Sequence, residues 1–216
     1  MNYSIIGFGK VGQALARAFA RKGISAAVAT TRPPEAIASA ARSIGPTIVS
    51  KSLKDALAAD VILLAVPFWA HRDVAQALPS WGGKIIIDAT NAYGVPLADL
   101  GDLPSSKVVA NALHGARLVK AFNHLAAPLL AQDPDVGGGR RVIFLSSDDE
   151  GAVATVAALV EKLGYAPVNL GKIAEGGQLV QARDKSWAPL IFQDLVKYGD
   201  LAARQSDRPK DGKRPV

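Results

Sequence analysis

A glycine-rich turn near the start of the chain restricts its fold more than any other feature. The short apolar run Ile5-Ile6 leads directly into Gly7-Phe8-Gly9-Lys10-Val11-Gly12, and an alanine-rich stretch follows from Gln13 to Arg21. In a dinucleotide-binding turn, a strand ends, the backbone turns tightly at the first glycine and approaches a pyrophosphate at the second, and a helix begins with its amides facing the anion. The sequence therefore predicts that Gly7, Phe8, Gly9, Lys10, Val11 and Gly12 contact a dinucleotide. For Lys10 a purely solvated position is the alternative.

A second apolar run, Ala26 to Ala29, ends in Thr30-Thr31-Arg32 about twenty residues beyond Gly12. A site specific for NAD places Asp or Glu there, on the ribose 2′-hydroxyl. Two hydroxyls and a guanidinium suit a 2′-phosphate instead, because Arg forms charge-assisted, often bidentate bonds to phosphate. We therefore expect NADP as the cofactor, with a solvated surface charge as the alternative for Arg32.

The composition suits a protein with a large core and no membrane span. Of the 216 residues, 49% are apolar, which is enough for one well-buried domain or one domain with a small appendage. The longest apolar run, Val61 to Trp69, falls short of the roughly eighteen residues of a membrane span, and no basic-then-apolar leader opens the chain. We expect a cytoplasmic protein without a membrane partner. Since the chain has no Cys, disulfides and thiolate catalysis are excluded.

The formal charge of +6 does not by itself indicate nucleic acid. Residues 204–216 hold five basic and two acidic side chains, so this segment supplies +3, half of the total. Its Pro and Gly content predicts a flexible basic tail. The interleaved aromatic residues of an RNA-binding sheet are missing, so no nucleic-acid partner is expected.

Apolar, largely β-branched runs alternate with alanine-rich helical stretches along the chain. Continuous apolar runs indicate strands buried on both faces, and hence a parallel sheet with helices above and below. The prediction is an α/β protein with a doubly wound parallel sheet, a Rossmann fold, in a single domain over residues 1–203, with a small C-terminal α/β extension from about residue 125. The seven predicted strands of the sheet are Tyr3–Ile6, Ala26–Ala29, Thr47–Val49, Val61–Val66, Lys84–Ala89, Leu118–Phe122 and Val142–Leu145.

Several helix limits can also be read from capping residues. Ser52 is expected to cap a helix over Leu53–Ala59, and Asp148-Asp149 to cap one over Glu150–Leu163 that Gly164 ends. The region from Ile173 to about Leu201 reads as helical, after a short run at Val168–Leu170. Gly137-Gly138-Gly139 reads as a turn before a strand.

Ligands of such a sheet bind at the carboxyl ends of its strands, so the residues just after each run are the candidates. Those after the fourth run are expected to pack on the ribose and nicotinamide, although Pro67 could simply end the strand. Asn91 could bond the nicotinamide carboxamide or a ribose hydroxyl, with an Asx-turn as the alternative. The additional candidates for cofactor binding are Ala65, Val66, Pro67, Phe68, Asn91 and Asn123.

The chemistry is narrowed by what these candidates lack. His71, His114 and His124 have no metal-ligand spacing, so no metal is expected. His124 follows a strand end and is a weak catalytic candidate, with a packing role as the alternative. None of the four Tyr has Lys four residues later, and no G-x-S-x-G turn occurs. Hydride transfer between two stacked redox rings fits best, because it needs little proton chemistry from the protein.

Taken in order and spacing, these motifs resemble a known family. Together with the glycine turn and Thr31-Arg32, the segments Asp88-Ala89-Thr90-Asn91, Lys120-Ala121-Phe122-Asn123 and Gly176-Gly177-Gln178-Leu179 resemble the NADPH-dependent coenzyme F-420 (F420) reductases, or deazaflavin:NADP oxidoreductases. The nicotinamide domain of the membrane ferric reductases is similar. The resemblance implies a compact Rossmann domain, NADP at the glycine turn and at Thr31-Arg32, hydride transfer to a deazaflavin or flavin, and a homodimer.

Three hypotheses for function follow. The first is an NADP-dependent oxidoreductase that passes a hydride between NADPH and a flavin-like acceptor, either coenzyme F-420 or a free flavin as co-substrate. The second is a redox sensor that binds NADP without turnover. The third is a reductase of a small imine or keto acid.

Overall fold

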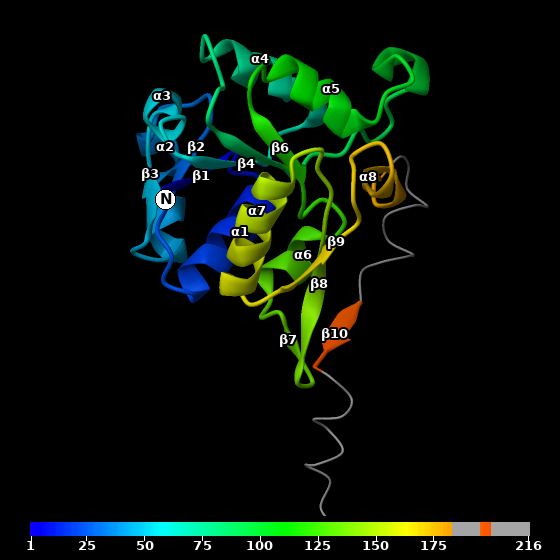
Figure 1. Ribbon diagram of the computed structural model, residues 1–216. Helices are drawn as coiled ribbons and strands as arrows, with labels where there is room; N and C mark the ends of the chain where they lie inside the picture. The colour runs from blue at the N-terminus through cyan, green and yellow to red at the C-terminus, as the bar shows by residue number, and fades with distance from the viewer. Residues whose placement is uncertain (183–194, 200–216) are drawn as a thin grey trace, which may run out of the picture.

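The computed structural model describes residues 1–182 and 195–199, and a parallel sheet of six strands forms its centre (Figure 1). The strand order is β3-β2-β1-β4-β5-β6, and every neighbouring pair is parallel. This is the order of a doubly wound sheet, so the predicted fold class is confirmed. The strands are β1 (Tyr3–Ile6), β2 (Ala26–Ala29), β3 (Ile48–Ser50), β4 (Val61–Leu64), β5 (Ile85–Asp88) and β6 (Arg117–Lys120).

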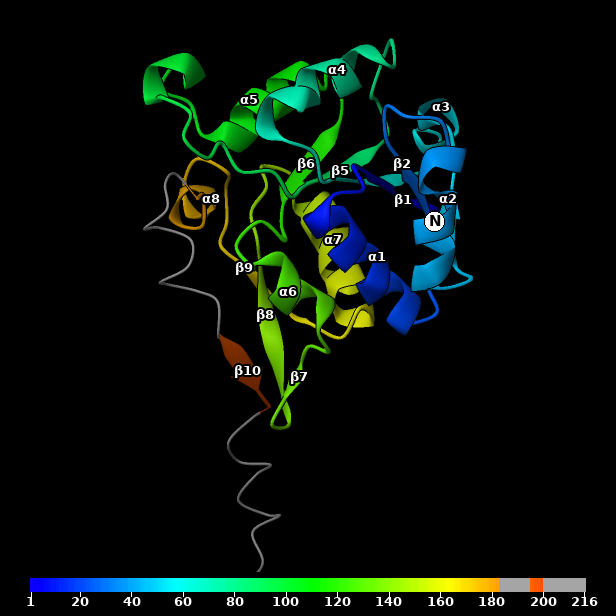
Figure 2. The ribbon, with the colours of Figure 1, turned by 180° about the vertical axis from the view of Figure 1, so that it is seen from behind.

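Helices cover both faces of this sheet because its central strands are apolar on both sides. All residues of β4 and β5 are buried. Figures 1 and 2 show α4 and α5 on one side of the sheet and α1 and α7 on the other. One core cluster joins the sheet to α1 (Lys10–Arg21), α2 (Glu35–Ile44) and α7 (Glu150–Lys162), and a second joins it to α3 (Leu53–Ala56), α4 (His71–Gln76) and α5 (Ser105–Ala112).

The seventh apolar run lies in a second, smaller sheet, so its assignment to the main sheet is wrong. It belongs to β8 (Gly139–Leu145), which pairs with β7 (Asp135–Val136) and β10 (Val196–Tyr198) in antiparallel fashion and with β9 (Ala166–Asn169) in parallel. The physical reason is strand direction. The end of β8 meets β6 in antiparallel fashion, through a single bridge between Lys120 and Ser146, so it does not continue the parallel sheet. The predicted turn at Gly137-Gly138-Gly139, before a strand, is confirmed: Gly137 and Gly138 have positive φ between β7 and β8, and Gly139 is the first residue of β8.

The predicted C-terminal helical region, Ile173 to about Leu201, is wrong at Val196–Tyr198, which form a strand, while its residues 183–194 and 200–201 lie outside the described residues. Within Ile173 to Leu201 the described residues form only the short α8 (Gly176–Leu179) and the strand β10. A strand fits at this edge of β8 because Gly139 has no side chain: a Cβ there would lie 2.4 Å from a Val196 methyl carbon. Residues 183–194 and 200–216, which include the predicted basic tail, lie outside the described residues.

The capping predictions are confirmed, although the helices are shorter than expected. The Ser52 hydroxyl accepts a bond from the Asp55 amide at the start of α3, and the Asp149 carboxylate accepts one from the Ala152 amide at the start of α7. Gly164 follows the end of α7 with φ +95°. A further short helix, α6 (Ala127–Ala131), packs on α1.

In the part of the chain that the structure describes, no helix is long and apolar enough to cross a membrane.

Candidate functional site

The three glycines from the end of β1 to the first turn of α1 have three different surroundings. Gly7 has φ +100°, and a Cβ on it would lie 2.2 Å from the Ala65 carbonyl oxygen; a Cβ on Gly12 would lie 2.0 Å from the Gly7 carbonyl oxygen. A Cβ on Gly9 would meet nothing within 4 Å. The first and third glycines are therefore required by the fold itself. The second faces open space, which is where a dinucleotide-binding turn needs room for a pyrophosphate.

The start of α1 offers unpaired donors to that open space. Gly9 is the N-cap residue, so no side chain caps the helix, and no acidic residue occurs in the first turn. The first amides of a helix lack internal partners and carry a partial positive charge, which attracts an anion. Lys10 is exposed beside them, whereas Phe8 is buried and Val11 half-buried. The residues of the turn thus fit a dinucleotide pyrophosphate.

The loop after β2 presents the predicted 2′-phosphate contacts. The Thr30 hydroxyl accepts a bond of 3.1 Å from the Arg32 amide, which fixes the turn. Thr31 and Arg32 are exposed, and among the described residues Arg32 has no ion-pair partner. A free guanidinium and a free hydroxyl on one short loop are suited to a phosphate group.

The segment after β4 mixes core and surface positions. The Ala65 amide bonds the Ile6 carbonyl at 2.8 Å and so extends the sheet to the edge of the glycine turn. Pro67 then begins a short 3₁₀ helix (Phe68–Ala70). Phe68 is buried with its ring 4.8 Å from that of Trp69, and the Arg72 guanidinium lies 4.0 Å above the Trp69 ring. The Ala65 carbonyl and a methyl carbon of Val66 therefore border the glycine turn, 2.2 Å and 3.1 Å from the position that a Cβ on Gly7 would take.

Asn91 and Asn123 bond each other across the ends of β5 and β6. The Asn91 amide nitrogen donates to the Asn123 carbonyl at 2.7 Å, and the Asn123 amide nitrogen donates to the Asn91 side-chain oxygen at 3.1 Å. The pair also holds the chain beyond α8: Asn123 donates to the Val180 carbonyl at 2.7 Å, and the Ala182 amide donates to Asn91 at 3.3 Å. The Asn91 side chain thus bonds Asn123 and Ala182. A nicotinamide carboxamide would have to bond Asn91 in addition to these partners.

A buried ion pair lies beside the pair of Asn91 and Asn123, and no role for it was predicted from the sequence. The Lys120 ammonium lies 3.3 Å from an Asp88 carboxylate oxygen, and both side chains are buried. Burial alone would raise the pKa of Asp88, but Lys120 and hydrogen bonds from Ser106 and Thr90 outweigh it and hold that pKa below its usual value. The available signal was one charged residue within each of two apolar runs, Asp88 in Lys84–Ala89 and Lys120 in Leu118–Phe122.

His124 occupies a packed position. Its ring is 3% exposed, lies 5.0 Å from the Phe144 ring, and its Nε2 is 3.2 Å from the Val142 carbonyl oxygen. Burial lowers the pKa of His124 to about 4, against a smaller opposing effect of the Val142 carbonyl. The imidazole is therefore neutral near pH 7 and enclosed, which agrees with the packing role.

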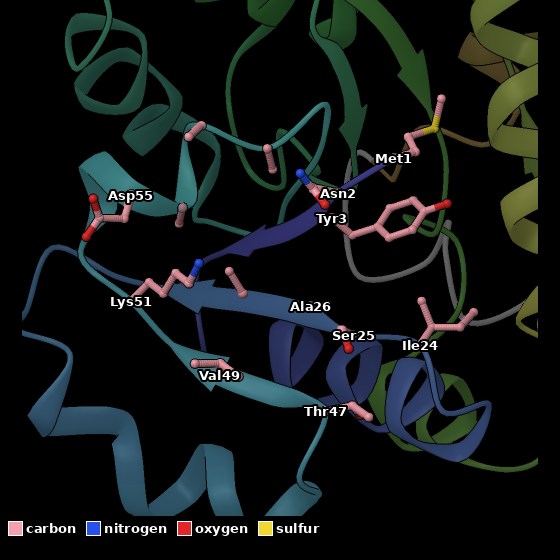
Figure 3. A pocket seen from close by; sticks show the side chains of 14 residues that line it. Met1, Asn2, Tyr3, Ile24, Ser25, Ala26, Thr47, Val49, Lys51 and Asp55 are labelled. Atoms are coloured by element: carbon pink, nitrogen blue, oxygen red, sulfur yellow. The ribbon is translucent and has the colours of Figure 1, made fainter.

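A hollow of about 440 Å³ lies on another part of the sheet (Figure 3). Its lining includes Tyr3, Val49, Lys51 and Asp55 but none of the predicted cofactor residues. Met1 to Tyr3 and Ile24 to Ala27 line it, so it lies near the amino ends of β1 and β2. Ligands of a doubly wound sheet bind at the carboxyl ends of its strands, so the hollow does not replace the strand-end site.

Comparisons with known proteins agree with this geometry. Residues 2–92 match the family described as NADP oxidoreductase, coenzyme F420-dependent. The solved structure of a hypothetical protein, SMa0349, from Sinorhizobium meliloti is 40% identical, with 93% of this chain and 96% of that one covered and a TM-score of 0.82. A putative F420-dependent NADP reductase from Arthrobacter sp. FB24 is 25% identical, with 83% and 90% covered and a TM-score of 0.66. Comparison with the curated proteins gave no match.

A more distant likeness concerns the fold alone. A reductive aminase from Aspergillus terreus, solved with NADPH and ethyl levulinate, is 20% identical with a TM-score of 0.60, and the match covers 82% of this chain but 57% of the aminase.

The fold and the glycine turn together define a dinucleotide-binding Rossmann protein. Within that class, the chain matches the coenzyme F420-dependent NADP oxidoreductase family over residues 2–92, and the resemblance seen in its motifs is confirmed. It is an NADP-dependent oxidoreductase with NADP as its cofactor.

Proposed function

We propose that the protein transfers a hydride between NADPH and a flavin-like acceptor, with coenzyme F-420 as the first choice and a free flavin as the second. The observation that carries this proposal is the burial of two titratable side chains, Asp88 at the end of β5 and His124 in the loop after β6. Asp88 is ionised and sealed by its partners, and His124 is neutral and enclosed. Neither is placed to give a proton to a substrate, which favours an acceptor ring whose reduction relies on stacking.

The proposed cofactor contacts follow the edge of the sheet. The amides after Gly9 bind the pyrophosphate, and the loop Thr30 to Arg32 binds the 2′-phosphate, which places the adenosine over β2. The nicotinamide half then extends in the other direction, past Ala65 to Phe68 and toward Asn91 and Asn123. When bound, NADPH supplies the hydride; the chain orients it and excludes water.

The wider organisation is proposed on separate grounds. Residues 1–203 are taken as one domain because a single core cluster includes Ile5 of the main sheet and Ile143 of the second sheet. A homodimer is proposed from the family resemblance, and a cytoplasmic location from the sequence. Independence from nucleic acid is proposed because half of the net charge belongs to residues 204–216.

An acceptor panel tests the proposal. The protein is mixed with NADPH and, in separate reactions, with coenzyme F-420, FMN, FAD, a cyclic imine and a keto acid, while absorbance at the NADPH band is followed. Reduction of a flavin-like acceptor is the expected result. With coenzyme F-420, which accepts the hydride at a carbon atom, deuterium from C4 of NADPH should be retained in the reduced ring; with FMN or FAD, which accept it at a nitrogen atom, the label should exchange into water. Turnover of the imine or keto acid alone would favour the third hypothesis, and tight NADPH binding without any turnover would favour the sensor.

A further inference from the structure

The ion pair of Lys120 and Asp88 joins two neighbouring strands at the edge of the sheet. The two residues are directly opposite in the register of β5 and β6 and are the last residue of each strand. Their side chains are 1% and 0% exposed. The residues before them in the same strands, Ile85 to Ile87 and Leu118 to Val119, are buried and apolar. The pair is therefore a charged insertion at the end of an otherwise apolar layer.

Stability alone does not explain such an insertion. Removing two charges from water carries a large desolvation penalty, and replacing a buried ion pair by apolar residues of similar volume is often neutral or stabilising. Two more apolar side chains at these positions would continue the pattern of β5 and β6. The pair must therefore be considered for what it holds in place.

The group that both charges hold is Thr90. Lys120 donates to the Thr90 carbonyl at 3.1 Å, while one Asp88 oxygen accepts from the Thr90 amide at 2.9 Å and from its hydroxyl at 2.6 Å. The other Asp88 oxygen accepts from Ser106 at the start of α5. All three polar groups of Thr90 are thus fixed, and the next residue is Asn91, whose side chain bonds Asn123.

Thr90 lies close enough to the glycine turn for these hydrogen bonds to affect a bound cofactor. The turn follows β1, and β5 is two strands away from β1 on the side opposite to β2. With strands about 4.8 Å apart, the end of β5 lies about 10 Å from the pyrophosphate position, within reach of a nicotinamide riboside. This step rests on the proposed placement of NADP.

We propose that Lys120, together with Asp88, is a positioning residue for the nicotinamide half of the cofactor. The pair acts through Thr90: it fixes the backbone of the Thr90-Asn91 loop, and that loop in turn fixes the surface on which the nicotinamide ring lies. The adenosine half, held at the other end of the sheet edge, does not depend on the pair.

Binding measurements separate this role from a structural one. The variant is the double substitution Lys120→Met/Asp88→Asn, which removes both charges, and the single Lys120→Met serves as a second variant that leaves the carboxylate unpaired. The matched control is Lys107→Met/Asp148→Asn, because Lys107 and Asp148 form an ion pair of the same 3.3 Å length whose side chains are 45% and 47% exposed. Dissociation constants are measured for NADPH and for adenosine 2′,5′-bisphosphate, which lacks the nicotinamide half.

The expected result is a change in one ligand only. In the double variant, the advantage of NADPH over the bisphosphate should fall by about tenfold or more, the equivalent of one or two hydrogen bonds, while affinity for the bisphosphate stays within about twofold. The single variant should show the same loss with a lower melting temperature, and the control should match the wild type.

Two results would overturn the inference in distinguishable ways. An unchanged advantage of NADPH in the double variant would show that the pair is structural, with the NADP site intact. Failure of the wild-type protein to bind either ligand would instead remove the proposed cofactor site itself, and this inference with it.

Discussion

Substitution of Gly9 by Val should separate cofactor binding from folding. A Cβ on Gly9 meets no protein atom within 4 Å, and its φ of −76° and ψ of −164° are accessible to any residue. The cost to the fold is then limited to a poorer N-cap, about 1 kcal/mol, which corresponds to a melting temperature lower by roughly 2–4 °C for a domain of this size. The side chain fills the pyrophosphate position, so affinity for NADP should fall by about 100-fold or more.

Gly12→Ala is the matched comparison, because one added methyl group there meets the Gly7 carbonyl oxygen at 2.0 Å. Forcing that contact apart should cost about 1–3 kcal/mol or more and lower the melting temperature further than Gly9→Val does. Thermal unfolding followed by circular dichroism and titration with NADP by calorimetry measure both quantities. The reasoning is refuted if Gly9→Val binds NADP as the wild type does, or if it unfolds more readily than Gly12→Ala.

Three further outcomes are expected. Arg32→Ala should remove most of the preference for NADPH over NADH, about 1.5–3 kcal/mol, and equal dissociation constants in the unmodified protein would contradict this. His124→Ala should lower turnover by less than about tenfold; a loss of about 10³-fold would make His124 a general acid. Hydrogen bonds from Arg117 and Ala152 lower the pKa of Asp149 to about 2. The stability that ionised Asp149 confers is therefore present above about pH 4 and lost between pH 4 and 2. The difference in unfolding free energy between wild type and Asp149→Asn should disappear over that interval, and a constant difference would argue against it.

The parts of the fold that could be predicted are those encoded in local patterns. The buried strands β4 and β5 are runs of apolar residues, and Ser52 and Asp149 cap helices through their own side chains. The choice of partner strand is not local. Nothing in Val142 to Leu145 distinguishes a strand beside β6 from one beside β9, because that choice depends on chain direction after the β7–β8 turn.

In the candidate site, too, local signals could be predicted from the sequence, and contacts between distant residues could not. The glycine turn could be located because glycine at Gly7, Gly9 and Gly12 is itself the signal. The hydrogen bonds between Asn91 and Asn123 could not be foreseen, since the two side chains are 32 positions apart and find each other only when β5 and β6 pair. The hydrogen bonds that Lys120 and Asp88 make to Thr90 could not be foreseen for the same reason.

The uncapped start of α1 makes the cofactor part of the thermodynamics of the fold. A phosphate group that satisfies those amides acts as a removable N-cap, so the folded state should gain free energy in proportion to the logarithm of cofactor concentration, about 2.7 kcal/mol at one hundred times the dissociation constant. Resistance of the protein to unfolding and to proteases would then follow the supply of NADP around it. The helix start couples the lifetime of the molecule to the pool of its own cofactor.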